Sequence, residues 1–401
     1  MNNNNCFPPS YEQATRQHAS LTGDLSVMDF LPYCLNDGGI FSQPKYQPFR
    51  ELMDRANHWL QNHSHLEVKT CESVEFKLGE DIESMTYLET CHGVNQFIRG
   101  LRLWLVPRLD PSRPPQYLKH LNLVPDPEET LDDVLLRFNQ LMETVPLPGR
   151  ILTVETQEMK VPSSGAFDPD KSNWSEMGNH ERHFIFVLRI FFEYGPPAHE
   201  DLGVRDFVPH ILNKELPFYE TFSQLVKRAS AWCSRQELLR VCHAQSVEIK
   251  IKDGVADSRK MSYTEHCMRN THYLRILRIA FTQPSLQWSH ELVSPPRLLL
   301  SCKTFFPSLG QDSMGCMASH VRAWVKAAKA RVLSVETAAM RLYTGGEEAL
   351  GPEASYTYNF YTQSEHWVFV IRVYMDGCYE DPFICVPPPI LPEESNCCAI
   401  L

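Results

Sequence analysis

The sequence has 401 residues, of which 43% are hydrophobic and 22% are charged, and its formal net charge is −11. This composition is typical of a globular protein that can bury a core, and it excludes a disordered or collagen-like chain. The acidic balance and the absence of a Lys/Arg run argue against a nucleic-acid partner, which needs a concentrated positive surface. We also expect neither an export signal nor a membrane-spanning segment.

The first motif along the chain is Pro8-Pro9-Ser10-Tyr11. It resembles the PPxY ligand of WW domains, which bind a polyproline II turn and a tyrosine in an aromatic groove. Pro8, Pro9 and Tyr11 are therefore the candidate WW-binding residues, and WW-bearing ubiquitin ligases are the implied partner class. The alternative is a chance match of four residues. We expect residues 1–40 to be a disordered arm that carries this motif.

Four segments have apolar residues at helical spacing, and each is followed by alternating strand-like patterns. The predicted helices lie near Phe49–Leu60, Leu131–Met142, Phe222–Trp232 and Met317–Ala328. The third begins with Thr221 and Gln224 at the spacing of a capping box. Each unit is predicted to be a helix followed by two strands.

The chain is also similar to itself. A shift of 173 positions aligns Phe49–Leu78 with Phe222–Ile251 with 11 identities in 30 residues, and Arg150–Lys160 resembles Arg331–Arg341. Sequence repetition at a fixed period indicates a duplicated architecture. We therefore predict an α+β fold of four diverged helix-strand-strand repeats, arranged as two related two-layer domains with antiparallel sheets.

The predicted domains are domain A, residues 41–210, with the first two repeats, and domain B, residues 211–383, with the last two. Proline-bearing stretches are expected to be linkers: Pro107–Glu129, Gly195–Glu220 and Pro284–Gly310. The middle stretch is expected to separate the two domains.

A Val-Glu dipeptide recurs once in each repeat, and an Arg between aliphatic residues follows it 27 to 36 residues later. The residues are Glu75 and Arg102, Glu155 and Arg189, Glu248 and Arg278, and Glu336 and Arg372. We interpret them as cross-strand ion pairs on the outer face of the sheet. The alternative is a charged ligand site, since carboxylates exchange protons and arginines bind anions.

The remaining residues with reactive side chains do not form a pattern typical of catalysis. His183 and His366 stand at matching positions before apolar strands, where a strand-entry role is favoured over metal binding. The 13 cysteines include no CxxC pair and no Cys/His set at zinc-site spacing. No phosphate loop, dinucleotide fingerprint or nucleophile elbow is present. We predict no catalytic residue, no metal and no cofactor.

The most specific motif is Cys398-Ala399-Ile400-Leu401. It matches a prenylation signal, in which Cys398 is the modified thiol, Ala399, Ile400 and Leu401 are the processing signal, and a terminal leucine favours geranylgeranyl. Methylation of Cys398 is expected to follow. One prenyl chain binds a membrane weakly, and residues 384–401, a proline-rich tail, offer no basic residue to help it. Cys397 is either a second, palmitoylated anchor or a spectator.

These features predict a prenylated adaptor or scaffold on the cytosolic face of the plasma membrane or an endomembrane. Its expected partners are the membrane surface, a prenyltransferase and WW-domain proteins. An alternative is a carrier whose α+β domains bind a lipid or another apolar ligand. A third alternative is an enzyme of unfamiliar motif, which needs a polar pocket in one half.

Overall fold

The computed structural model describes residues 24–36, 38, 44–90, 93–110, 112–162, 166–177, 181–213, 218–266, 270–285, 297–307, 313–342, 351–359 and 364–382. Over these ranges the chain forms four α-helices and a larger number of strands, and every strand pair is antiparallel. The fold is therefore of the mixed α+β kind that the sequence predicts.

The strands and helices recur in the same order along four segments, which we call units 1 to 4. Each unit has an outer strand, a helix, a long inner strand, a short strand and a long central strand. In unit 1 these are β1 (Ser26–Phe30), α2 (Phe49–Asn62), β4 (Leu66–Lys77), β5 (Thr86–Glu89) and β6 (Val94–Pro107). In unit 2 they are β7 (Leu118–Leu123), α3 (Leu131–Thr144), β8 (Gly149–Lys160), β9 (Asn173–Met177) and β10 (Arg182–Tyr194).

Units 3 and 4 follow the same order. In unit 3 the elements are β11 (Glu200–Phe207), α4 (Phe222–Cys233), β14 (Arg240–Lys252), β16 (Ser262–Glu265) and β17 (Thr271–Pro284). In unit 4 they are β18 (Leu300–Phe305), α5 (Met314–Ala328), β19 (Val332–Leu342), β20 (Tyr356–Asn359) and β21 (Glu365–Asp376). Unit 1 adds the hairpin strands β2 (Cys34–Asn36) and β3 (Lys45–Tyr46). Unit 3 adds β12 (Ile211–Asn213), β13 (Phe218–Tyr219) and β15 (Val255–Ala256).

The helices begin and end close to where the sequence places them. Thr130 and Thr221 accept hydrogen bonds from the third residue of α3 and α4, and the Asp133 and Gln224 side chains return a bond to the cap residues. The capping box predicted at Thr221 is thus confirmed. These boxes satisfy backbone N–H groups that a helix start leaves without partners.

The short strand of each unit pairs with the central strand of the preceding unit. Strand β9 pairs with β6, β16 with β10 and β20 with β17. Strand β5 of unit 1 pairs with β21 of unit 4, which closes the series into a ring. The inner strands contact one another in the same cyclic order, β4 with β8, β8 with β14, β14 with β19, and β19 with β4.

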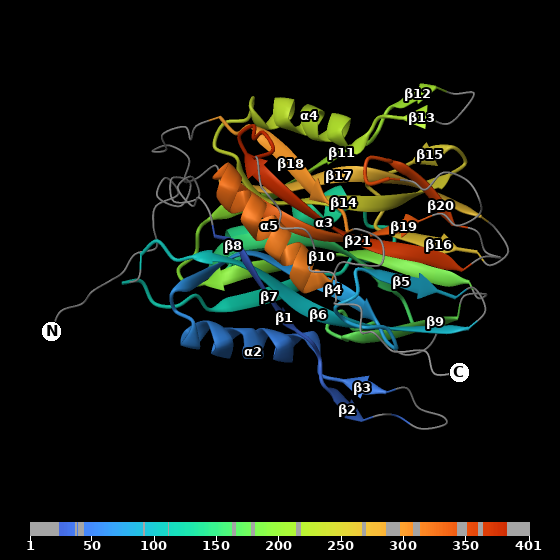
Figure 1. Ribbon diagram of the computed structural model, residues 1–401, viewed down its shortest axis with the longest axis horizontal. Helices are drawn as coiled ribbons and strands as arrows, with labels where there is room; N and C mark the ends of the chain where they lie inside the picture. The colour runs from blue at the N-terminus through green and yellow to red at the C-terminus, as the bar shows by residue number, and fades with distance from the viewer. Residues whose placement is uncertain are drawn as a thin grey trace, which may run out of the picture.

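Each helix packs beside the outer strand of the following unit. Figure 1 shows α2 and α4 on opposite sides of the strands and α5 in front of them. Helix α2 contacts β7, α3 contacts β11, α4 contacts β18 and α5 contacts β1. The four main hydrophobic cores accordingly lie between consecutive units. One of them joins α3 of unit 2 to Val247 and Ile276 of unit 3, and another joins α5 of unit 4 to Leu25 and Trp104 of unit 1.

The structure corrects three expectations. The predicted linkers contain the outer strands β7, β11 and β18, and the predicted N-terminal arm, residues 1–40, contains β1. Each unit therefore has five elements where the sequence predicts a helix and two strands. A division at residue 210 does not separate the cores, because three of them contain residues from both sides of it.

Candidate functional site

Four arginines at the middle of the central strands are almost completely buried. Arg102, Arg189, Arg278 and Arg372 are exposed by only 1%, 0%, 4% and 0%. The expected position on an outer, solvated face is therefore wrong. The side chains face the preceding unit of the ring, which excludes water from these positions.

The residues opposite these arginines differ in part from the predicted partners. The strand register places Glu72, Glu155, Gln245 and Glu336 across from them. Glu155 and Glu336 thus face the predicted arginines. Glu75 and Glu248 lie three residues further along their strands, where they form ion pairs with Arg99 at 2.5 Å and Arg275 at 2.8 Å.

Each buried arginine reaches into the preceding unit, where it donates to a hydroxyl oxygen. The pairs are Arg102–Thr337, Arg189–Ser73, Arg278–Thr156 and Arg372–Ser246, with N–O distances of 3.1, 2.6, 3.1 and 2.7 Å. The backbone N–H of each hydroxyl residue donates in return to the residue opposite the arginine. Those acceptors are Glu72, Glu155, Gln245 and Glu336, at 2.5, 2.9, 2.8 and 2.6 Å.

This set of bonds, which we call the ring network, joins every unit to its neighbour in the same way. In units 1 and 3 the arginine also forms an ion pair with an outer-strand aspartate, Asp29 or Asp206. In units 2 and 4 the guanidinium lies 4.0 Å from a ring of the preceding unit's helix, Phe49 for Arg189 and Phe222 for Arg372. The four repeated arginines, with Glu155 and Glu336, therefore join neighbouring units of the ring.

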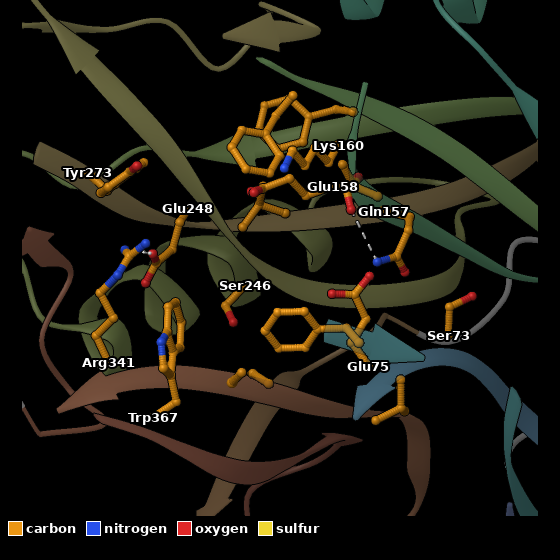
Figure 2. A pocket seen from close by; sticks show the side chains of 18 of the residues that line it. Ser73, Glu75, Gln157, Glu158, Lys160, Ser246, Glu248, Tyr273, Arg341 and Trp367 are labelled. Carbon is orange, nitrogen blue, oxygen red and sulfur yellow. Dashed lines mark hydrogen bonds and ion pairs between the residues drawn. The ribbon is translucent and has the colours of Figure 1, made fainter. Parts of the chain in front are cut away.

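A central cavity of about 270 Å³ lies toward the C-terminal ends of the four inner strands. Its wall contains residues of all four units, including the short strands β5, β9 and β16. Figure 2 shows Glu248, Arg341 and Trp367 together on one side of the cavity, and Ser73, Glu75 and Gln157 on another.

Carboxylates outnumber cationic side chains in this wall. The acidic residues are Glu75, Glu89, Glu158, Glu176, Glu248, Glu265, Glu336 and Glu365, and the basic residues are Lys160, Arg182, Arg275 and Arg341. The ring of strands thus encloses a space whose wall has an excess of negative groups.

Two arginines each bridge two of the carboxylates. Arg182 contacts Glu176 at 2.7 Å and Glu265 at 2.5 Å. Arg341 contacts Glu248 at 2.8 Å and Glu365 at 2.9 Å. Charge-assisted hydrogen bonds of this kind stabilise carboxylates that have lost most of their water.

Two other carboxyl groups are less well compensated. Burial raises the pKa of Glu158 to about 8, and the Tyr263 hydroxyl, which donates to it at 2.7 Å, lowers it only in part. Burial also raises the pKa of Glu89 well above its ordinary value, and the nearby carboxylates Glu176 and Glu365 raise it further. No residue that the structure describes hydrogen-bonds or ion-pairs with the Glu89 carboxyl.

Aromatic rings line the cavity where the short strands join the central strands. Phe97 stacks on Trp174 with ring centroids 4.4 Å apart, and Phe184 stacks on Tyr263 at 5.2 Å. Tyr87 and Trp367 are parallel at 5.9 Å. Aromatic faces beside carboxylates form a surface that attracts organic cations.

This cavity was not predicted, although the sequence contains a signal for it. The short strands repeat an aromatic residue two positions before a glutamate, in Tyr87-Leu88-Glu89, Trp174-Ser175-Glu176 and Tyr263-Thr264-Glu265. Alternation along a strand places both side chains on one face. The short strands are only four or five residues long, and their partner strands belong to another unit.

The other candidate residues are distributed as follows. His183 and His366 are the second residues of β10 and β21 and are exposed, as expected for strand-entry positions. Among the described residues no cluster of His, Cys, Asp and Glu has the arrangement of a metal site. No described helix is long and apolar enough to cross a bilayer. The WW-binding residues Pro8, Pro9 and Tyr11, and the lipidation residues Cys397 to Leu401, lie outside the described residues.

Comparison with known proteins does not assign the chain to a group. No protein-family model matches it, and no curated protein and no solved structure is significantly similar to it.

Proposed function

We propose that this protein is a non-enzymatic adaptor, held by a prenyl group on the cytosolic face of a plasma or internal membrane. The observation that carries the proposal is the motif Cys398-Ala399-Ile400-Leu401, which fits a geranylgeranylation signal at every position. The ring network supports a scaffold role, because it uses the most regularly repeated charged residues to join the units.

The anchor is tested with Cys398→Ser in cells, where the tagged variant is imaged beside the wild type. We expect the wild type at a membrane and the variant in the cytosol, since the serine oxygen does not replace the thiol in prenyl transfer. Mass analysis of the C-terminal peptide provides the direct readout. An unmodified Cys398 with the last three residues intact would contradict the proposal.

The same experiment examines Cys397. A single prenyl chain gives only marginal membrane binding, so a second lipid on Cys397 would prolong it. We expect Cys397→Ser to weaken membrane retention while leaving prenylation of Cys398 unchanged. Equal retention of wild type and variant would leave Cys397 without an anchoring role.

We further propose that Pro8, Pro9 and Tyr11 recruit a WW-domain protein, for example a ubiquitin ligase. A WW domain binds the tyrosine in a pocket beside the polyproline turn. Tyr11→Ala should abolish capture of isolated WW domains, whereas the same change at Tyr33, which is exposed in the described part of the chain, should leave it intact.

We infer that the four units are diverged repeats, grouped as two related halves, units 1 and 2 and units 3 and 4. Features that alternate between units support this grouping. Units 1 and 3 both have an extra hairpin before the helix and an aspartate that pairs with the buried arginine. Units 2 and 4 have Asn122 and Thr304 at that position and share an aromatic ring contact to the arginine. The halves then interlock by exchange of short strands.

A second candidate function is a carrier that holds a ligand in the central cavity. The sequence led us to consider a lipid or another apolar ligand. The carboxyl groups of Glu89 and Glu158 favour a polar ligand of positive charge instead, because they form no ion pair with a described side chain and an apolar molecule would leave them without water.

A further inference from the structure

We propose that the central cavity binds a small linear aliphatic diamine, held between carboxylates at its two ends and aromatic rings along its length. This inference goes beyond the adaptor function, and it does not depend on the prenyl group or on the WW ligand. It specifies the chemical class of ligand for a site that the ring of four units creates.

The charge of the wall selects a cation. Arg182 and Arg341 are each shared between two carboxylates, and Arg275 pairs with Glu248. Glu89 and Glu158 are the two carboxyl groups of the wall that form no ion pair with a described side chain. An ammonium group would offer three N–H donors to their oxygens.

Glu89 is the proposed contact for one ammonium group of the ligand. Its carboxyl lines the cavity, and among the described residues nothing hydrogen-bonds or ion-pairs with it. Across the strand pair it stands directly opposite Glu365. Two like charges in register destabilise a sheet unless a counter-charge lies between them. A ligand ammonium at this position would supply that counter-charge.

Glu158 is the proposed contact for the other ammonium group of the ligand. Its carboxyl accepts one hydrogen bond, from the neutral hydroxyl of Tyr263, and the charged groups that face it are Glu265, Glu248 and Arg341. The groups facing Glu89 are Glu176, Glu365, Arg341 and Arg182. The wall therefore has two undercompensated carboxyl groups, each with different acidic neighbours, and this pattern fits two ammonium groups on one molecule.

The size and walls of the cavity select an organic ligand. A volume of about 270 Å³ corresponds to roughly nine water molecules at about 30 Å³ each, which is ample for a diamine with four carbons. The stacked rings of Phe97, Trp174, Phe184 and Tyr263 cover the methylene groups and favour positive charge. A bare metal ion has no matching ligand cluster among the described residues.

Binding should release protons. Burial raises the pKa of Glu158 to about 8, so this carboxyl is largely neutral at pH 7 without a ligand, and burial also raises the pKa of Glu89 well above its ordinary value. A neighbouring ammonium favours the ionised form and lowers both pKa values. Each carboxyl that ionises on binding loses a proton, and by linkage the affinity increases as the pH is raised from 6 to 8.

The test is isothermal titration calorimetry on the full-length recombinant chain without its lipid, with 1,4-diaminobutane as the probe. 1,4-Butanediol, which has nearly the same shape and no charge, is the control ligand. We expect saturable binding of the diamine only, proton release at pH 7 when buffers of different ionisation enthalpy are compared, and tighter binding at pH 8 than at pH 6. Equal binding of diol and diamine, no diamine binding, or affinity that is independent of pH would each overturn the proposal.

Two variants locate the site. Glu89→Gln and Glu158→Gln keep the side-chain volume, and each should weaken diamine binding at least about tenfold, because a charge-assisted hydrogen bond is lost. Glu80→Gln makes the same change of net charge at an exposed residue and should bind as the wild type does. If the cavity variants bind as tightly as Glu80→Gln, the diamine occupies another site and the proposal is wrong. A failure here leaves the anchor and WW experiments unaffected.

Discussion

His243 occupies a position at which the other three units have a small hydroxyl residue. Thr70, Thr153 and Ser334 stand at the same place beside a register shift of the inner strand. Their hydroxyl oxygens accept from backbone N–H groups of a neighbouring unit, at 3.1 to 3.2 Å. His243 is 2% exposed, and its Nδ1 has no hydrogen-bond partner among the described residues.

This burial makes His243 sensitive to acid. Desolvation lowers its pKa from 6.5 to about 3. Between these values the unfolded chain binds a proton that the folded chain does not, so stability decreases as the pH falls through this window. The slope for one proton is about 1.4 kcal/mol per pH unit.

We therefore predict that His243→Gln is less sensitive to acid than the wild type. From pH 6.5 to pH 5 the wild type should lose about 2 kcal/mol more unfolding free energy than the variant, as measured by urea denaturation at each pH. His366→Gln, at an exposed position, is the matched control and should follow the wild type. Parallel pH profiles for wild type and His243→Gln would contradict the prediction.

For single residues, the sequence indicates which side chains recur better than it indicates whether they are buried. The four recurring arginines are identifiable by self-comparison, and two of the four predicted glutamates, Glu155 and Glu336, stand opposite them. Of these two pairs, Glu336 and Arg372 form an ion pair, at 3.6 Å. Their complete burial is not predictable from one strand, because the groups that replace water, such as Ser73 and Thr337, belong to other units. An alternating strand in isolation gives no sign of which face a distant unit will cover.

Among the elements, the outer strands depend on contacts that the sequence does not reveal. Strand β1 has only five residues, and it pairs with β6 through backbone bonds and through Asp29, which makes two hydrogen bonds to Arg102 at 2.7 and 2.6 Å. A short strand within a polar or proline-bearing stretch resembles a loop until its partner is known. The helices were predictable because their apolar spacing and caps are local.

The contribution of this contact is tested by Asp29→Asn. The change leaves the Arg102 guanidinium buried with its charge poorly compensated, and we expect the unfolding free energy to fall by about 2–3 kcal/mol. That is less than for a fully buried pair, because the Asp29 side chain is 30% exposed. The measurement is chemical denaturation at pH 7.

Asp132→Asn is the matched control, since Asp132 pairs with Arg259 at 3.3 Å and the Asp132 side chain is 65% exposed. Its effect should stay below about 1 kcal/mol. Equal losses in the two variants would mean that the Asp29 contact adds no more to stability than a surface ion pair does.

For the whole molecule, closure of the ring is the consequential feature. Strand exchange and the ring network join unit 4 to unit 1 as they join the other neighbours. A self-comparison of the sequence shows how often a unit recurs, but it contains no information on whether copies stack, separate or close on themselves. The central cavity follows from closure, since its wall takes residues from all four units.

Because the four units form a closed ring, we predict that neither half of the chain is stable alone. A fragment of residues 24–197 loses β16, the partner of β10, and a fragment of residues 198–382 loses β5, the partner of β21. Each also exposes one side of the cores that join α3 to unit 3 and α5 to unit 1. Exposed apolar surface of this extent should prevent a cooperative fold. We expect each purified fragment to show no cooperative thermal transition and rapid proteolysis.

The two fragments produced together should restore a complex with the thermal transition of the intact chain, because every lost strand partner is then present in the other fragment. The intact chain is the reference, and both preparations are followed by circular dichroism and limited proteolysis. Cooperative unfolding of a single fragment would mean that the halves are independent domains joined only by contact, and the cavity between them would then depend on how the two domains dock.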